Sequence, residues 1–246
     1  MNRVIEEISR TRTPVGAAGA VIPLNSEVSA HEGEFLYDMV KKSPKARKTL
    51  EVGCAEGLST LHICDALKGR EGAQHYVIDP FQMSQWHGAG VRALERAGLR
   101  QYATLIEERS EVALPKLLAQ HENTFDLVFI DGWHTFDHTL IDCFYSLRLL
   151  AVGGLLVIDD CDMASVGKAV AYLSQYPCLR RIGDVTDYPQ NALLRGLCHI
   201  ARYTPISLDH RHKLPLTLRK LVRRPNMVAL EKTCTDVRGW NWYAPF

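Results

Sequence analysis

The stretch Glu51-Val52-Gly53-Cys54-Ala55-Glu56-Gly57 follows Lys48-Thr49-Leu50, and together they have the pattern of a strand that runs into a glycine turn before a helix. Glycines let the backbone bend sharply and approach a ligand closely, and the first turn of a helix offers unpaired N–H groups. The pattern therefore predicts a site for a nucleotide-like ligand. The spacing Gly53-x-x-x-Gly57 differs from the G-x-G-x-x-G of dinucleotide sites, and the preceding Glu51 favours a ligand that carries positive charge over a pyrophosphate.

Composition limits the classes of function that the chain can serve. Its 246 residues are 46% hydrophobic and 23% charged, which suits one well-buried α/β domain, and its net charge of +1 gives no electrostatic reason to expect nucleic acid. The apolar runs are too short to span a bilayer and the first residues lack an apolar signal core, so we expect a cytoplasmic chain with no membrane partner. The seven cysteines form no C-x-x-C pair, and we expect most of them to be small buried hydrophobes.

Short apolar runs alternate with helix-like segments along most of the chain. Strands are expected at 49–52, 75–78, 103–106, 125–130, 155–158, 179–185 and 227–231, and helices at about 31–42, 57–68, 89–97, 110–120, 136–150 and 166–174. Continuous apolar strands need cover on both faces, so this alternation predicts an α/β fold with a doubly wound, mostly parallel seven-stranded sheet.

Two domain-level segments flank this pattern. Residues 1–48 are expected to form a lead-in and a helical cap over the ligand site, and residues 49–246 the main domain, with an insertion at about 186–226. The insertion carries a basic run at 210–224 that reads either as a solvated surface or as an anion-binding patch. The aromatic tail at 240–246 is expected to dock on the core or on a partner subunit, and we expect a homo-oligomer.

Acidic residues follow the apolar strands at the edge where ligands bind in such sheets. Glu51, Asp79, Asp131 and the pair Asp159-Asp160 each stand at the end of a different expected strand. A carboxylate after the second strand is well placed to accept the hydroxyl hydrogens of a ribose, which is the role expected of Asp79.

Four segments in order carry a family resemblance. They are Glu51-x-Gly53-x-x-x-Gly57-x-Ser59-Thr60, Val77-Ile78-Asp79-Pro80-Phe81, Phe125-Asp126-Leu127-Val128-Phe129-Ile130-Asp131-Gly132-Trp133-His134, and Gly153-Gly154-Leu155-Leu156-Val157-Ile158-Asp159-Asp160. Over about residues 31–170 the chain resembles the class I S-adenosylmethionine-dependent methyltransferases, and within them the catechol-type and macrolide-sugar or aminocoumarin-type metal-dependent O-methyltransferases. The resemblance implies a Rossmann-like methyltransferase fold with S-adenosylmethionine as cofactor. The cofactor-binding residues that it implies are Glu51, Gly53, Ala55, Gly57, Ser59, Asp79, Ser110, Asp131 and Trp133, with the glycine turn at the amino-acid part, Asp79 at the ribose, and Ser110 and Trp133 near the adenine.

The same resemblance matches Asp131, Asp159 and Asp160 to the ligands of a divalent metal, Mg²⁺ in expectation. Carboxylates that converge at strand ends repel one another, and a hard dication removes that repulsion. Neighbouring strand residues point to opposite faces, so Asp159 and Asp160 both reach one ion only if the strand ends there; otherwise one of them caps the following helix.

His134 occupies the position of the lysine base in the catechol-type enzymes. A histidine is largely neutral at pH 7 and can accept a hydroxyl proton, although a packing or surface role is the alternative. With Asp131 it forms the expected catalytic pair. The implied reaction moves a methyl group from S-adenosylmethionine to a hydroxyl of a small molecule such as a natural product, sugar or catechol. A metal-independent O- or N-methyltransferase of the same fold, a nicotinamide-dependent oxidoreductase and a non-catalytic binding protein remain open alternatives.

Overall fold

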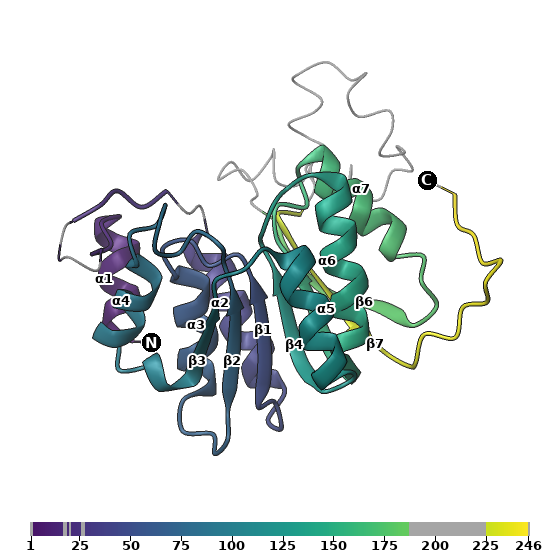
Figure 1. Cartoon of the computed structure of the whole chain (residues 1–246), viewed down its shortest axis with the longest axis horizontal. Coiled ribbons are helices and arrows are strands. Elements are labelled where there is room, and N and C mark those ends of the chain that lie inside the picture. The colour runs from purple at the N-terminus through teal and green to yellow at the C-terminus, as the bar shows by residue number, and fades with distance from the viewer. Residues whose placement is uncertain (1, 17–18, 20, 26–27, 187–224, 246) are drawn as a thin grey trace, which may run out of the picture.

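A seven-stranded sheet with helices on both faces forms the body of the protein (Figure 1). The computed structural model describes residues 2–16, 19, 21–25, 28–186 and 225–245. The strands are β1 (Lys48–Val52), β2 (Gln74–Ile78), β3 (Ala103–Ile106), β4 (Phe125–Ile130), β5 (Leu150–Ile158), β6 (Leu179–Val185) and β7 (Met227–Lys232). The helices are α1 (Arg3–Thr11), α2 (Ala30–Lys42), α3 (Leu58–Leu67), α4 (Ala89–Arg96), α5 (Ser110–His121), α6 (Phe136–Leu149) and α7 (Ala164–Leu173), with the 3₁₀ turn η1 (Arg100–Tyr102) before β3.

The strand order β3-β2-β1-β4-β5-β7-β6 confirms the predicted doubly wound sheet. The strands β1 to β5 pair in parallel, whereas β7 pairs antiparallel with both β5 and β6. The order reverses between β1 and β4, and at such a reversal the loops that follow the two strands separate and leave a crevice for a ligand. The Asp131 N–H donates to the Val52 carbonyl at 2.8 Å, so the loop after β4 lies directly beside the glycine turn.

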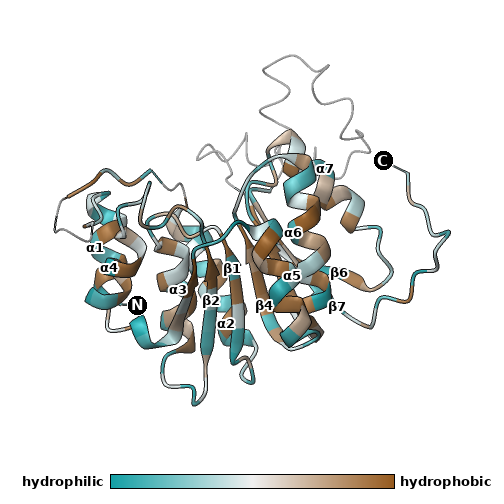
Figure 2. Ribbon diagram, in the orientation of Figure 1, coloured by the Kyte–Doolittle hydropathy of each residue, from teal (hydrophilic) through white to brown (hydrophobic). Residues whose placement is uncertain are grey.

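Strand alternation decides what each face of the sheet contacts. Leu50 and Val52 of β1 belong to the core beneath α5, α6 and α7, and so the intervening Thr49 and Glu51 point toward the opposite helical layer. Figure 2 shows β4, a mostly hydrophobic strand, enclosed between these layers. Its Phe125, fully buried, belongs to the α5–α7 core. The sequence alternation therefore sends one acid of the glycine-turn motif into the protein interior.

The N-terminal segment contains two helices. The expected lead-in begins with α1, because the Asn2 side chain caps the Val4 N–H and the apolar side chains of Ile5 and Ile8 are buried. Helix α2 has a capping box at Ser29 and packs with α3 on the sheet.

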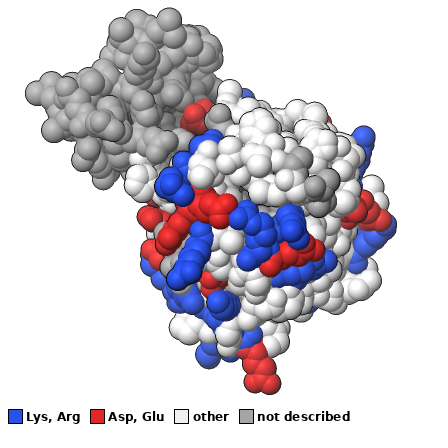
Figure 3. Space-filling model, turned by 90° about the vertical axis from the view of Figure 1, so that its left-hand side faces the viewer, with Lys and Arg blue, Asp and Glu red and all other residues white. Residues whose placement is uncertain are grey.

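Surface and tail features of the described residues bear on the remaining expectations from the sequence. No helix among the described residues combines the length and apolar character that a bilayer crossing requires. On the face in Figure 3, basic and acidic side chains are interspersed. Of the six cysteines in the described part of the chain, Cys234 alone is exposed. In the tail, Trp242 packs against Tyr176 at a ring distance of 5.2 Å. The basic run at 210–224 lies outside the described residues.

Candidate active site

Two positions of the turn after β1 require glycine. Gly53 has φ of +90°, and a Cβ there would lie 2.0 Å from the carbonyl oxygen of Asp131. Gly57 has φ of +85°, and a Cβ there would lie 2.7 Å from the Cα of Gly90. Both residues adopt backbone angles that disfavour a side chain and bring other backbone within contact distance. The turn is therefore packed against the Asp131 loop on one side and the start of α4 on the other.

Asp79, the expected ribose acid, holds the turn from the end of β2. Its Oδ2 accepts hydrogen bonds from the N–H groups of Cys54 at 3.1 Å and Ala55 at 2.9 Å, while Oδ1 accepts from the Phe81 N–H at 2.8 Å. The side chain is buried, and burial raises the pKa of Asp79 against the opposing effect of these N–H groups. Asp79 thus fixes the shape of the turn, and its contact with a ribose stays a prediction.

Glu51 lies beneath the turn rather than at its surface. Its carboxylate is fully buried and accepts hydrogen bonds from the Ser59 and Thr60 hydroxyls at the start of α3. His75 Nε2 lies 3.1 Å from Glu51 Oε2, and its Nδ1 lies 2.8 Å from the Thr49 hydroxyl. These partners account for a buried acid without any cation from a ligand. Direct contact of Glu51 or Ser59 with a cofactor stays a prediction.

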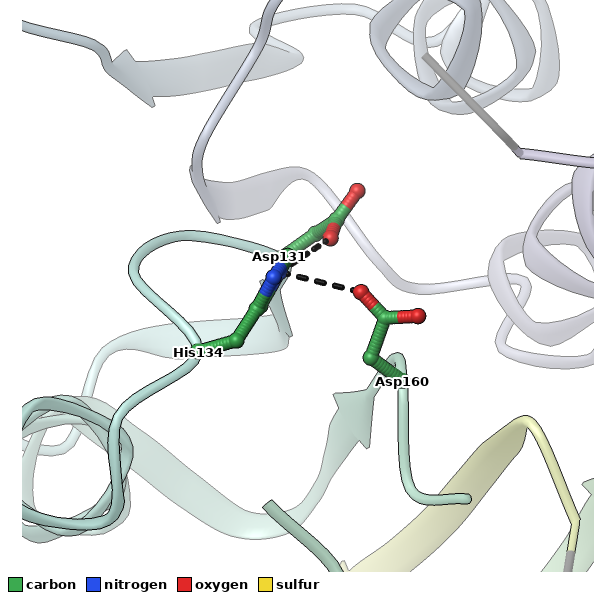
Figure 4. Close-up of side chains that lie close together, drawn as sticks. All are labelled: Asp131, His134 and Asp160. Carbon is green, nitrogen blue, oxygen red and sulfur yellow. Dashed lines mark hydrogen bonds and ion pairs between the residues drawn. The ribbon is translucent and has the colours of Figure 1, made fainter. Parts of the chain in front are cut away.

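Asp131, His134 and Asp160 come together where β4 and β5 end (Figure 4). His134 Nε2 lies 3.3 Å from Asp131 Oδ1 and 3.0 Å from Asp160 Oδ2, and one ligand atom from each residue falls within 4.8 Å of the others. Asp160 reaches this position because β5 ends at Ile158 and its own φ is +52°. The predicted end of the strand is therefore present.

Burial, hydrogen bonding and neighbouring charges shift the pKa values of this cluster. Burial raises the pKa of Asp131 to about 6; the hydrogen bond from His134 opposes the rise and the charge of Asp160 adds to it. The hydrogen bond with Asp131 raises the pKa of His134, burial opposes that rise, and Asp160 adds to it. The cluster as it stands therefore favours a positive charge between two carboxylates.

Asp159 lies next to this cluster but is not one of its three members. It is 7% exposed, and its Oδ1 accepts the Asp160 N–H at 2.9 Å. Burial raises its pKa strongly, and the nearby acids Asp131 and Glu32 raise it further. Asp159 is thus close to the cluster, and its role as a metal ligand stays a prediction.

The residues expected near an adenine flank the same edge. Ser110 is the first residue of α5, and Trp133 follows Gly132 in the loop after β4 with 61% of its surface exposed. The Trp133 ring lies 6.5 Å from that of His138. No described contact ties Ser110 or Trp133 to the glycine turn, so their grouping with it rests on the sequence resemblance.

Sequence reasoning missed two buried residues that organise the site. His75 pairs with Glu51, and the available signal was a polar residue in β2 at the position that pairs with Thr49 of β1. Gln82 is fully buried beside the glycine turn, where it contacts Ala55 and Gly90. Its local sequence carries no signal of this, because the contacts depend on how the loop after β2 returns to β1.

Comparisons with known proteins agree with this arrangement. Residues 50–161 match a family model described as a methyltransferase domain. No curated protein sequence matches the chain. Among solved structures, an O-methyltransferase from Bacillus cereus in complex with SAH is 16% identical, with 94% of this chain and 92% of that chain covered and a TM-score of 0.64.

Two further structures are similar at the same level. TomG from Streptomyces achromogenes, an O-methyltransferase involved in tomaymycin synthesis and solved with SAM, is 15% identical, with 95% and 91% of the two chains covered and a TM-score of 0.64. Cofactor-bound Rv0187 from MTB is 17% identical, with 85% and 83% covered and a TM-score of 0.60. Likeness at this identity shows a shared fold. The family model thus matches residues 50–161 as a methyltransferase domain, and the solved structures show that its fold is shared with O-methyltransferases.

Proposed function

We propose that the protein is a divalent-metal-dependent O-methyltransferase that transfers a methyl group from S-adenosylmethionine to a hydroxyl of a small molecule. The observation that carries the proposal is the cluster of Asp131, His134 and Asp160 beside the glycine turn. The main-chain contact between Gly53 and Asp131 makes the expected cofactor site and the cluster one continuous edge of the sheet. Solved O-methyltransferases of the same fold bind SAM or SAH, which supports this choice of cofactor.

The donor set fits a divalent cation. Two carboxylates and an imidazole nitrogen converge within 4.8 Å. A positive charge between the carboxylates would oppose the rise in the pKa of Asp131 that burial and, to a smaller extent, the charge of Asp160 cause. Asp131 and Asp160 would hold the ion, with Asp159 as the further ligand that the sequence resemblance implies. When bound, the metal would orient the acceptor hydroxyl and increase its acidity.

The protein residues then have defined tasks in the proposed reaction. The acceptor oxygen forms a bond to the methyl carbon as the C–S bond breaks, and the bonding electrons remain on sulfur. The hydroxyl proton would pass to His134 Nε2, which is free to accept it only when Asp131 and Asp160 bind the cation in place of the imidazole. The glycine turn and Asp79 hold the methyl donor in line with the acceptor, and Trp133 lies near its adenine. Such a transfer relies on proximity and orientation rather than on a covalent enzyme intermediate.

One observation favours a metal-independent variant of the same reaction. His134 Nε2 pairs with both Asp131 and Asp160, as in an imidazole that donates to two carboxylates and keeps Nδ1 as the proton acceptor. In that case Asp131 and Asp160 orient the imidazole and stabilise its protonated form after it takes the proton. Sensitivity of the reaction to a chelator separates the two mechanisms.

We infer that the acceptor is a natural product, a sugar or a catechol-like compound, and that the chain assembles as a homo-oligomer. The acceptor inference follows from the need for two oxygens to use the open positions of an ion. The inference of assembly rests on the C-terminal tail, where Trp240 and Tyr243 are 98% and 75% exposed.

Binding of the cofactor is tested by isothermal titration calorimetry with S-adenosylhomocysteine and with NAD. We expect S-adenosylhomocysteine to bind and NAD to give no heat of binding. Preferential binding of NAD would refute the proposal and favour an oxidoreductase.

Metal binding is tested by titrating the protein with Mn²⁺ and following free Mn²⁺ by electron paramagnetic resonance. We expect one site per chain, and at least about a tenfold loss of affinity in Asp131→Asn and Asp160→Asn. Asp137→Asn is the matched control, because this carboxylate is close in sequence but 73% exposed. Equal Mn²⁺ binding by all four proteins would refute the metal site.

A further inference from the structure

Gln82 lies in the loop after β2 and joins two elements of the cofactor edge through one side chain. It is fully buried. Its Nε2 donates to the Ala55 carbonyl at 2.8 Å, and its Oε1 accepts from the Gly90 N–H at 2.9 Å. Both ends of the amide are therefore used, one on the glycine turn and one on the first turn of α4.

The residue that Gln82 contacts has an unusual backbone conformation. Ala55 has φ of +45°, in the left-handed region that residues with a side chain avoid. Its N–H donates to Asp79 at 2.9 Å and its carbonyl accepts from Gln82. A strained residue persists when its surroundings determine its conformation from more than one side, and here Asp79 and Gln82 do so from the two ends of Ala55.

The packing of α4 explains why Gln82 can reach the turn. A Cβ at Gly90 would lie 2.8 Å from Cys54 Sγ and 3.1 Å from Gln82 Oε1, so only glycine leaves room for this arrangement. A Cβ at Gly57 would likewise lie 2.7 Å from the Cα of Gly90. The far end of α4 is anchored to α1 by an ion pair between Arg96 and Glu7 at 2.7 Å. Gln82 therefore connects the turn to a helix that is itself held in place.

We propose that Gln82 is a positioning residue for the cofactor, acting through the Ala55 peptide. This inference rests on the proposed role of the glycine turn as the cofactor site. By holding Ala55 in its left-handed conformation, Gln82 keeps the turn in its binding shape before the cofactor arrives, so that binding does not have to order it. Its loss weakens cofactor binding and leaves the metal cluster, which it does not touch, unchanged.

The test compares the affinity of the whole chain for S-adenosylhomocysteine in wild type and in Gln82→Met, a side chain of similar length without hydrogen-bonding ends. We expect the dissociation constant to rise about tenfold, the order of effect of losing a buried hydrogen bond. Gln85→Met is the matched control, since Gln85 is an exposed glutamine of the same loop, and it should bind as wild type does. Mn²⁺ affinity should change less than about twofold in both variants.

Two further variants separate positioning from a general loss of folding. Gln82→Glu keeps the acceptor for Gly90 but places a second acceptor opposite the Ala55 carbonyl, and it should also bind S-adenosylhomocysteine more weakly. Ala55→Gly removes the penalty of the left-handed conformation, so in the Gln82→Met background it should restore most of the lost affinity. Melting temperatures measured in parallel identify a variant that has lost its fold.

Wild-type affinity in Gln82→Met and Gln82→Glu would overturn the inference. Failure of Ala55→Gly to restore binding in a folded Gln82→Met chain would overturn the route through Ala55. A wild-type chain that binds no S-adenosylhomocysteine would instead refute the proposed function, and so the two failures are distinguishable.

Discussion

Replacement of Gly53 by alanine should destabilise the protein through two separable effects. The first is the backbone angle, because φ of +90° costs a residue with a side chain about 1–2 kcal/mol relative to glycine. The second is steric, because the new Cβ would lie 2.0 Å from the Asp131 carbonyl oxygen, whereas ordinary contact begins at 3.4 Å. The three nearest atoms to this Cβ all belong to the backbone of Asp131 and Gly132, so the clash is relieved only if the glycine turn and the Asp131 loop move apart. This movement should cost about 1–3 kcal/mol.

The chain contains a control that isolates the first effect. Gly153 has φ of +86°, and a Cβ there would meet nothing within 4 Å. We therefore expect Gly153→Ala to lower the free energy of unfolding by about 1–2 kcal/mol and Gly53→Ala by about 2–5 kcal/mol. Urea denaturation followed by circular dichroism measures both, and melting temperatures should fall by roughly 2–4 °C per kcal/mol.

The comparison of Gly53→Ala with Gly153→Ala also tests whether the glycine turn takes part in cofactor binding. Separation of the turn from the Asp131 loop should weaken binding of S-adenosylhomocysteine in Gly53→Ala but not in Gly153→Ala. Equal destabilisation of the two variants, with unchanged ligand binding in both, would show that the contact between Gly53 and Asp131 is absent in solution and would refute this reasoning.

Three other predictions concern stability and assembly. Burial lowers the pKa of His62 to about 4 in the folded protein, so as the pH falls below 6.5 the unfolded protein takes up a proton at His62 before the folded protein does. Wild type should therefore lose about 2 kcal/mol of unfolding free energy between pH 7.5 and 5 that His62→Leu retains, and parallel curves of stability against pH for the two proteins would contradict this. Lys232 is 2% exposed and donates three hydrogen bonds, so urea denaturation should show Lys232→Met to be about 2–4 kcal/mol less stable than wild type. Lys45→Met, at an exposed position, should be as stable as wild type, and equal stability of both variants would contradict a stabilising role of the Lys232 hydrogen bonds. Light scattering should show an oligomer that dissociates when Trp240 and Tyr243 are both replaced by serine, and a monomeric wild type would contradict the proposed assembly.

The fold was predictable because the signals that determine it are local. The apolar runs of the central strands are continuous, and only a sheet covered on both faces buries them, which gave β1 to β5 and the helices between them. Acids directly after those strands indicated the ligand edge, and the structure brings Asp131 and Asp160 together there. Helix α1 was missed because its three buried apolar residues, Val4, Ile5 and Ile8, are followed by a stretch rich in threonine, proline and glycine.

The supports of the site were less predictable because they depend on tertiary contacts. Glu51 lies beneath the turn because strand alternation directs it toward α3, where His75 from the next strand meets it; its contact with a cofactor stays a prediction. The resemblance matched both Asp159 and Asp160 to a metal. The left-handed conformation of Asp160 directs that residue to His134, and the role of Asp159 stays a prediction. No sequence pattern announces the contact between Gln82 and Ala55, since it exists only once the loop after β2 has folded back.

The central claim is most directly tested by the effect of a chelator on methyl transfer. Transfer of a labelled methyl group from S-adenosylmethionine to a panel of catechols and glycosides would be measured before EDTA treatment, after it, and after addition of excess Mg²⁺. We predict that EDTA lowers the rate with the accepted substrate at least about a hundredfold and that Mg²⁺ restores it. An unchanged rate in EDTA would contradict metal dependence and leave the histidine held by Asp131 and Asp160 as the catalytic group on its own.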